Sequence, residues 1–120
     1  MGTTYHEDLN ELSDAAKEAH RALTTVIEEL EAVDWYNQRV DVCKDPQLKA
    51  IMAHNRDEEI EHAAMGLEWL RRTMPKFDTQ LRTFLFSEGD VTHLEEGGEG
   101  GEAAGGGADN SLGLGNLKGA

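Results

Sequence analysis

The first third of the chain carries an apolar repeat that is compatible with little except a long helix. Apolar residues recur at alternating steps of three and four over residues 9–33: Leu9, Leu12, Ala16, Ala19, Leu23, Val26, Leu30 and Val33. This period places them on one side of an α-helix, as in a coiled-coil seam. Neither Pro nor Gly interrupts residues 7–42, so the pattern predicts one helix over about Glu7 to Val42.

A second helix start follows at Asp45-Pro46. Asp45 can cap free backbone N–H groups, and Pro46 suits the first helical position, where its missing N–H is redundant. This helix is expected to run to Thr73, before Pro75. The short turn between the two helices predicts an antiparallel hairpin. A third, shorter helix is expected over about Phe77 to Phe86.

The composition divides the chain into three parts: a helical domain over 1–90, a flexible Gly/Glu-rich linker over 91–110, and a terminal segment over 111–120. Leucines return in that last segment, at Leu112, Leu114 and Leu117. Such a terminus could simply fray, but leucines placed beyond a long glycine-rich spacer favour a docking peptide.

An isolated two-helix hairpin leaves its apolar stripe uncovered, so it must bury that stripe against another element. A second copy of the hairpin would complete a four-helix bundle. The fold class predicted from the sequence is therefore all-α: a two-helix antiparallel hairpin plus a short C-terminal helix, dimerising into a four-helix bundle, which the family resemblance described below identifies as ferritin-like.

Glu59 and His62 fall within the expected apolar stripe of the second helix, which we place at Leu48, Met52, Asn55, Glu59, His62, Gly66 and Trp69. A buried carboxylate is costly unless it is paired or binds a metal. Glu-x-x-His is a weak signal by itself, because the chain is rich in Glu and Asp90-x-x-His93 also matches. Its position on the stripe makes it a candidate metal site.

Glu29 lies about as far before the turn as Glu59 lies after it, so the hairpin should bring the two residues to the same height. Asp34 flanks the other edge of the stripe and is the rival to Glu29. Two hairpins would combine four carboxylates with two imidazoles. The four negative charges of the carboxylates balance the charge of two Fe(II) ions. Oxygen and imidazole ligands without thiolate suit iron or manganese.

Several other residues have both a functional and an ordinary interpretation. Tyr36 is two helical turns from Glu29 and could hydrogen-bond a ligand or supply an electron, although interface packing is the more common role for it and for Trp35. Glu28 and Glu31 could attract Fe(II), or could form a solvated helix face. Cys43, the lone cysteine, excludes an internal disulfide and favours a reducing compartment.

The net charge of the chain indicates which classes of partner it can bind. With 24 acidic and 11 basic residues, the formal net charge is −13, which argues against nucleic acid as a partner, because phosphate binding needs a basic face. No apolar run approaches the roughly 20 residues that cross a bilayer, and the polar N-terminus lacks the apolar stretch of a signal peptide. We therefore expect a cytoplasmic protein without a membrane partner.

Three strings closely resemble the helices of encapsulated ferritins: EELEAVDWYNQRVD over 28–41, AHNRDEEIEHAAM over 53–65 and LEWLRR over 67–72. The resemblance covers about residues 5–90. The terminal LGLGNLK over 112–118 resembles the peptide by which such cargo docks inside an encapsulin shell, so residues 111–118 are the expected shell contact.

This resemblance implies a ferroxidase that oxidises Fe(II) with O₂ at a di-iron centre between two subunits, inside an encapsulin nanocompartment. The implied iron ligands are Glu29, Glu59 and His62 from each subunit, with Tyr36 nearby and Glu28 and Glu31 where metal enters. It also implies a decamer of five dimers.

Two rival functions remain open at this point. One is a non-catalytic helical cargo or scaffold protein with a structural interface metal. The other is a different ferritin-like di-iron oxidase or peroxidase, although those proteins usually carry two Glu-x-x-His motifs in one chain, whereas this chain has only one on a stripe.

Overall fold

The computed structural model describes residues 5–94, and this part of the chain is helical with no strand. The element order is η1 (Leu9–Glu11), α1 (Asp14–Val42), α2 (Pro46–Thr73), α3 (Pro75–Phe84) and η2 (Val91–His93). The all-α prediction is therefore confirmed. The predicted linker beyond Leu94 and the docking peptide at 111–120 lie outside the described residues.

The start of the first helix differs from the prediction. A 3₁₀ turn at Leu9–Glu11 precedes α1, and Leu12 and Ser13 between them have extended backbones. The Ser13 hydroxyl accepts a hydrogen bond from the Ala16 N–H at 3.0 Å. This side-chain cap satisfies a free donor of the first turn, so α1 begins at Asp14. The apolar residues of the repeat that precede Asp14, Leu9 and Leu12, are therefore not part of α1.

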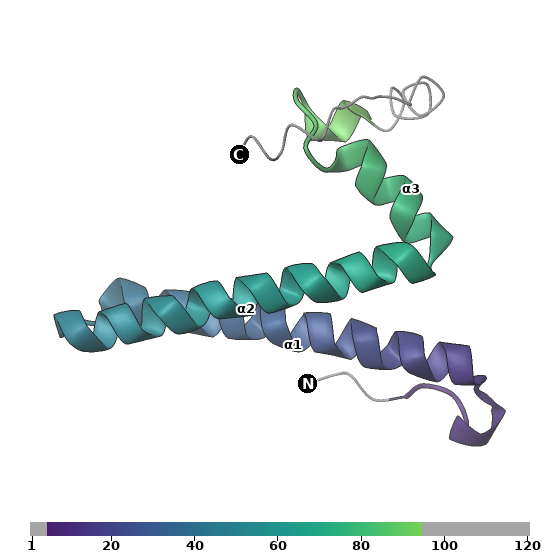
Figure 1. Cartoon of the computed structure of the whole chain (residues 1–120), viewed down its shortest axis with the longest axis horizontal. Helices are drawn as coiled ribbons and strands as arrows, with labels where there is room; N and C mark the ends of the chain where they lie inside the picture. Colours follow the sequence, from purple (N-terminus) through teal and green to yellow (C-terminus); the bar gives the residue numbers. More distant parts are fainter. Residues whose placement is uncertain (1–4, 95–120) are drawn as a thin grey trace. The chain divides into compact units, whose positions relative to one another are not determined.

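The hairpin turn follows the sequence prediction closely. Cys43 is extended and donates its backbone N–H to the Arg39 carbonyl at 2.9 Å, which closes α1. Asp45 Oδ2 accepts the Leu48 N–H at 2.8 Å, and α2 begins at Pro46 and ends at Thr73. The turn is so short that α1 and α2 return antiparallel and pack along each other (Figure 1).

The hairpin alone buries little. Of the described residues, only Ala63 and Leu70 are buried hydrophobics, at 7% and 1% exposure. Leu48 and Trp69, which the sequence placed on the buried stripe of α2, are exposed, as is Leu30 of the α1 seam. The stripe was expected to be covered by a second hairpin, so it stays a prediction, and Ala63 and Leu70 mark the part of α2 that a single chain already buries.

The described chain divides into two units, the first ending at Thr73 and the second beginning at Met74. In the second unit, α3 begins at Pro75 rather than at the predicted Phe77, because proline fits the first helical position after an extended residue, here Met74. It ends at Phe84 rather than Phe86. Leu85 is extended and Phe86 has φ 60°, which a helix cannot accommodate.

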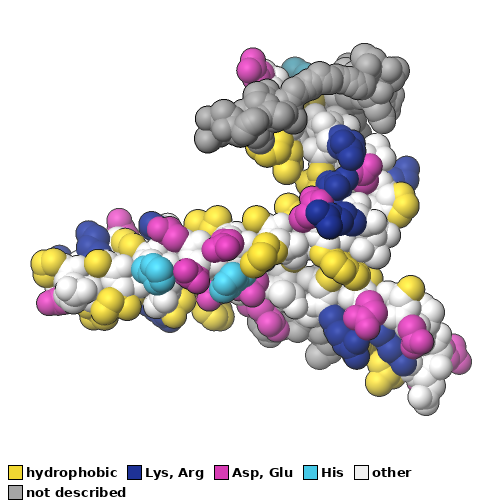
Figure 2. Space-filling view, in the orientation of Figure 1, with side chains coloured by type: hydrophobic (Ala, Val, Ile, Leu, Met, Phe, Trp, Pro, Cys, Tyr) yellow, Lys and Arg dark blue, Asp and Glu magenta, His cyan; other side chains and the backbone are white. Residues whose placement is uncertain are grey.

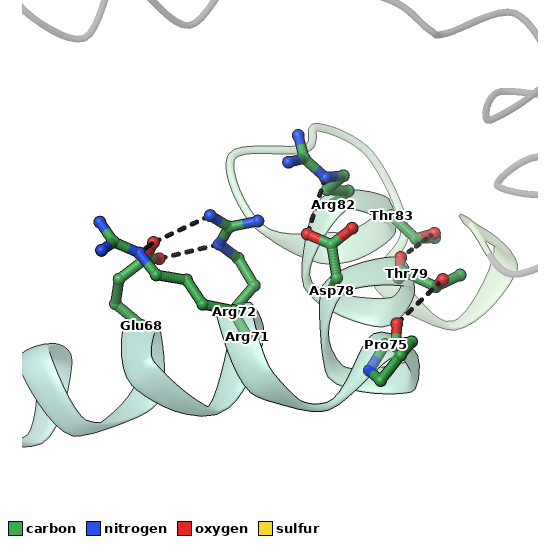
Figure 3. A network of polar contacts seen from close by, with 8 residues as sticks. All are labelled: Glu68, Arg71, Arg72, Pro75, Asp78, Thr79, Arg82 and Thr83. Atoms are coloured by element: carbon green, nitrogen blue, oxygen red, sulfur yellow. Dashed lines mark hydrogen bonds and ion pairs between the residues drawn. The ribbon is translucent and has the colours of Figure 1, made fainter.

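Local side-chain hydrogen bonds run along α3. Arg82 Nε donates to Asp78 Oδ1 at 2.9 Å, and the hydroxyls of Thr79 and Thr83 donate to carbonyls one turn earlier (Figure 3). Among residues 5–94, no helix is both long and apolar enough to span a membrane.

Candidate metal centre

Three potential metal ligands meet where α1 and α2 pack side by side. Glu29 comes from α1, and Glu59 and His62 come from successive turns of α2; one ligand atom from each residue lies within 4.8 Å of the others. The i, i+3 spacing of Glu59 and His62 puts both side chains on the same side of α2. The hairpin brings Glu29 to the same height, as predicted from its distance to the turn.

One nitrogen of the His62 imidazole faces both carboxylates. Its Nδ1 is 3.6 Å from Glu29 Oε1 and 3.5 Å from Glu59 Oε1. The side chains of Glu29 and Glu59 are 22% and 24% exposed, whereas His62 is 41% exposed. The cluster is thus half-buried against the hairpin and open on its other side.

The carboxylates perturb each other. The pKa of Glu29 is raised, first by a side-chain hydrogen bond with Glu59, then by partial burial and by repulsion from the Glu59 charge; the neighbouring His62 only partly offsets this. Partial burial lowers the pKa of His62, but attraction to Glu29 and hydrogen bonding to Glu59 outweigh it, so its pKa is also raised. The site as a whole therefore favours an added positive charge.

The donor set fits a divalent metal that prefers oxygen and nitrogen. Two carboxylates and one imidazole, with no thiolate, suit iron or manganese better than copper(I). A metal bound here would replace the shared protons by a stronger positive charge, which relieves the repulsion between Glu29 and Glu59. One chain supplies three donors, so part of the coordination sphere would have to come from outside it.

The sequence reasoning missed Glu58, which lies against the outer side of the same imidazole. Glu58 Oε1 is 4.0 Å from His62 Nε2, and Glu58 Oε2 is 3.4 Å from His54 Nε2. The signal was present in the sequence, because His54, Glu58 and His62 are spaced four apart and so follow one edge of α2. Figure 2 shows histidine side chains among acidic ones on the hairpin, with hydrophobic side chains exposed beside them.

The remaining predicted residues are not brought into the cluster. Tyr36 lies under the guanidinium of Arg39, whose Cζ is 5.1 Å from the ring centroid. Glu28 and Asp34 are exposed and Glu31 is half-buried, and none of the three belongs to the group of metal ligands found within residues 5–94. Of the two rivals for the α1 position, the structure therefore groups Glu29, not Asp34, with Glu59 and His62.

A helical hairpin that places one Glu on the first helix opposite a Glu-x-x-His on the second carries half the ligand set of a ferritin-like carboxylate bundle. Residues 4–88 match the model of the EncFtn-like family. The chain belongs to this family, which confirms the resemblance seen in the sequence.

Individual relatives agree with this assignment. An encapsulated ferritin-like protein of Rhodospirillum rubrum is 55% identical over 95% of this chain and 87% of its own length. A ferritin-like protein of Thermotoga maritima is 50% identical over 89% of this chain and 94% of its own. A crystal structure of a protein from Nitrosomonas europaea matches with a TM-score of 0.72 and 58% identity, over 74% of this chain and 98% of that one.

Proposed function

We propose that this protein is a ferroxidase, which oxidises Fe(II) to Fe(III) with O₂ at a di-iron centre shared by two subunits. The observation that carries the proposal is the cluster of Glu29, Glu59 and His62, whose ligand atoms converge within 4.8 Å. Two copies of this cluster would supply four carboxylates and two imidazoles, the ligand set of carboxylate di-iron sites in helix bundles.

The surface around the cluster supports its completion by a second copy. Leu30 and Ile60, the sequence neighbours of Glu29 and Glu59, are 55% and 50% exposed, and Met65, one turn beyond His62, is 58% exposed. Large apolar side chains around a half-buried polar cluster are expected at an interface. Pairing two hairpins would bury them and exclude water from the iron.

Each residue then has a defined role towards the iron substrate. Glu59 would bridge the two irons, and Glu29 and His62 would complete each coordination sphere. The four carboxylates of two subunits would balance the charge of two Fe(II) ions, and the two imidazoles would add neutral nitrogen ligands. Tyr36 lies within two turns of Glu29 on α1 and would act from outside the ligand set, while Glu28 and Glu31 would draw Fe(II) towards the site.

The same proposal covers the assembly. We place the protein inside an encapsulin nanocompartment, docked through residues 111–118, which stores the oxidised iron. Support comes from the relative in Rhodospirillum rubrum, described as encapsulated, which matches 95% of this chain. A decamer of five dimers remains the expected assembly from the family resemblance.

The test is O₂ consumption and Fe(III) formation after anaerobic Fe(II) loading. The wild-type protein should accelerate both well above the rate without protein, and His62→Ala should abolish the acceleration while keeping its helical circular dichroism. His93→Ala is the matched control, because His93 also follows an acidic residue by three positions but pairs with Asp90 in the second unit. If wild-type protein gave no acceleration, a scaffold with a structural metal would be the better description.

A further inference from the structure

Gly66 of α2 lies against the side chain of Val26 of α1, beside the candidate metal centre. A Cβ placed on Gly66 would lie 2.7 Å from Val26 Cγ2, a separation that real Cβ atoms essentially never show. Among the described residues, Val26 supplies the one neighbouring atom within 4 Å of that position outside the immediate backbone of α2. The Val26 side chain therefore occupies space that the side chain of any other residue type at position 66 would need.

This contact continues the packing line that holds the cluster. Gly66 is one helical turn beyond His62, and Val26 is about one turn before Glu29. In an antiparallel hairpin these two steps lead in the same direction, so the Val26–Gly66 contact lies one turn from the meeting point of Glu29 and His62. Buried Ala63 and Leu70 flank Gly66 on the same face.

A second link lies on the other side of the cluster. Arg56 of α2 donates from Nη1 to Asn37 Oδ1 of α1 at 3.0 Å. Asn37 follows Glu29 along α1, and Arg56 precedes Glu59 along α2. The cluster therefore lies between a close packing contact on one side and a polar contact between the two helices on the other.

We propose that Gly66 is a positioning residue of the metal centre: by admitting Val26 against its backbone, it sets the separation of α1 and α2 that lets Glu29 reach His62. Val26 cannot easily rotate away from an added methyl group, because a valine in a helix has one strongly preferred rotamer. An alanine at position 66 would instead push the helices apart at the level of the cluster. This inference rests on the proposed metal site for its functional consequence.

The substitution Gly66→Ala separates this role from ordinary helix stability. Alanine is the better helix former, so a glycine without a packing role should give a variant at least as stable as the wild type. We expect instead a folded variant whose affinity for Co(II), followed by the visible absorption of the bound ion, falls at least tenfold. The double variant Val26→Ala/Gly66→Ala, which removes the opposing methyl groups, should recover most of that loss.

Glu61→Ala is the matched control, since Glu61 is exposed on the same helix as Gly66 and lies outside the ligand cluster, and it should bind Co(II) like the wild type. Wild-type Co(II) affinity in folded Gly66→Ala, or failure of the double variant to recover binding, would overturn the inference. If Gly66→Ala does not fold, recovery of both folding and Co(II) binding in the double variant decides the question in the same way.

The metal site and the positioning role can fail separately. If wild-type protein does not bind Co(II), the proposed metal centre is wrong, and crystal structures of the metal-free wild type and Gly66→Ala then test the packing alone. The distance from Glu29 Oε1 to His62 Nδ1, 3.6 Å in the wild type, should lengthen in the variant. An unchanged distance would show that Gly66 does not set it.

Discussion

Glu29 of α1 and His62 of α2 bring Oε1 and Nδ1 to 3.6 Å from each other, and the same nitrogen lies 3.5 Å from Glu59. One imidazole thus faces two carboxylates that repel each other. Ligands gathered in this way destabilise the folded protein when no metal is present, and a bound metal offsets the repulsion between them. The first two predictions follow from this conflict.

Replacing Glu29 by Gln should weaken metal binding yet stabilise the metal-free protein. The pKa of Glu29 is raised by its contact with Glu59, so its ionised form is disfavoured in the folded state, and stability is lost as the pH rises through that pKa. Glutamine has no such loss. At pH 7 with EDTA, Glu29→Gln should melt a few degrees higher than the wild type, whereas its Co(II) affinity should fall roughly tenfold or more.

Glu61→Gln is the control for this experiment, since Glu61 is exposed on α2, the helix that carries Glu59 and His62, and lies outside the ligand cluster. Both its melting temperature and its Co(II) affinity should match the wild type. A lower melting temperature for Glu29→Gln in EDTA would show that the attraction of Glu29 to His62 outweighs its repulsion from Glu59.

Metal should also drive association. If two half-sites combine, a divalent ion binds the paired state and not the separate chains, so it stabilises the pair by mass action, by about 2.7 kcal/mol when its concentration is 100 times its Kd. Sedimentation velocity should therefore show a larger species with Co(II) or anaerobic Fe(II) than with EDTA, and His62→Ala should remove the difference. A metal-loaded species that sediments as a single chain would contradict a site shared by two subunits.

Local signals in the sequence predicted most of this architecture. The caps at Asp45 and Pro46 fixed the start of α2, and the short turn after Val42 fixed the antiparallel return, so the grouping of Glu29 with Glu59 and His62 could be anticipated from distances along the chain. The start of α1 could not, because the apolar repeat continues through Leu12 and only the Ser13 cap interrupts the helix. The end of α3 was misplaced for a related reason: Leu85 and Phe86 continue its apolar side but leave the helix.

The apolar repeat could not predict the details of packing between the two helices. A period of three and four defines a stripe but not which of its residues meet the neighbouring helix, and the contact of Gly66 with Val26 is seen only in the structure. The repeat also did not single out Ala63 and Leu70, which a single chain buries. Glu58 was missed because its contact with His62 involves the outer edge of α2, away from the stripe.

The cap at Asp45 should matter measurably for the hairpin. Asp45 Oδ2 accepts the Leu48 N–H, and removal of such a cap usually costs about 1 kcal/mol. Asp45→Ala should lower the free energy of unfolding by about that amount in denaturant titrations followed by circular dichroism. Asp41→Ala is the control: an acidic residue in the last turn of α1 opposes the helix dipole, so its removal should be neutral or slightly stabilising.

Glu68 should contribute to stability in a pH-dependent manner. Hydrogen bonds from Arg71 and then Arg72 lower the pKa of Glu68 to about 2 (Figure 3). A lowered carboxyl pKa contributes stability that is fully present above the ordinary value of 4.5 and is lost as the pH falls towards 2. Glu68→Gln should therefore melt slightly below the wild type at pH 7, and the two melting temperatures should converge between pH 4.5 and 2. A difference that stays constant over this range would exclude the ionised carboxylate as its source.

Deleting residues 111–120 should separate iron chemistry from encapsulation. Glu29, Glu59 and His62 all belong to the hairpin unit that ends at Thr73, so the deletion removes no ligand, and Fe(II) oxidation should proceed at the wild-type rate. Co-expressed encapsulin shells should then contain no cargo, as judged by gel analysis of purified shells. A full-length variant with Leu112, Leu114 and Leu117 changed to Ser should behave like the deletion, because docking of a short segment depends on burial of its apolar side chains. Cargo retained by the deletion variant would assign docking to another part of the chain.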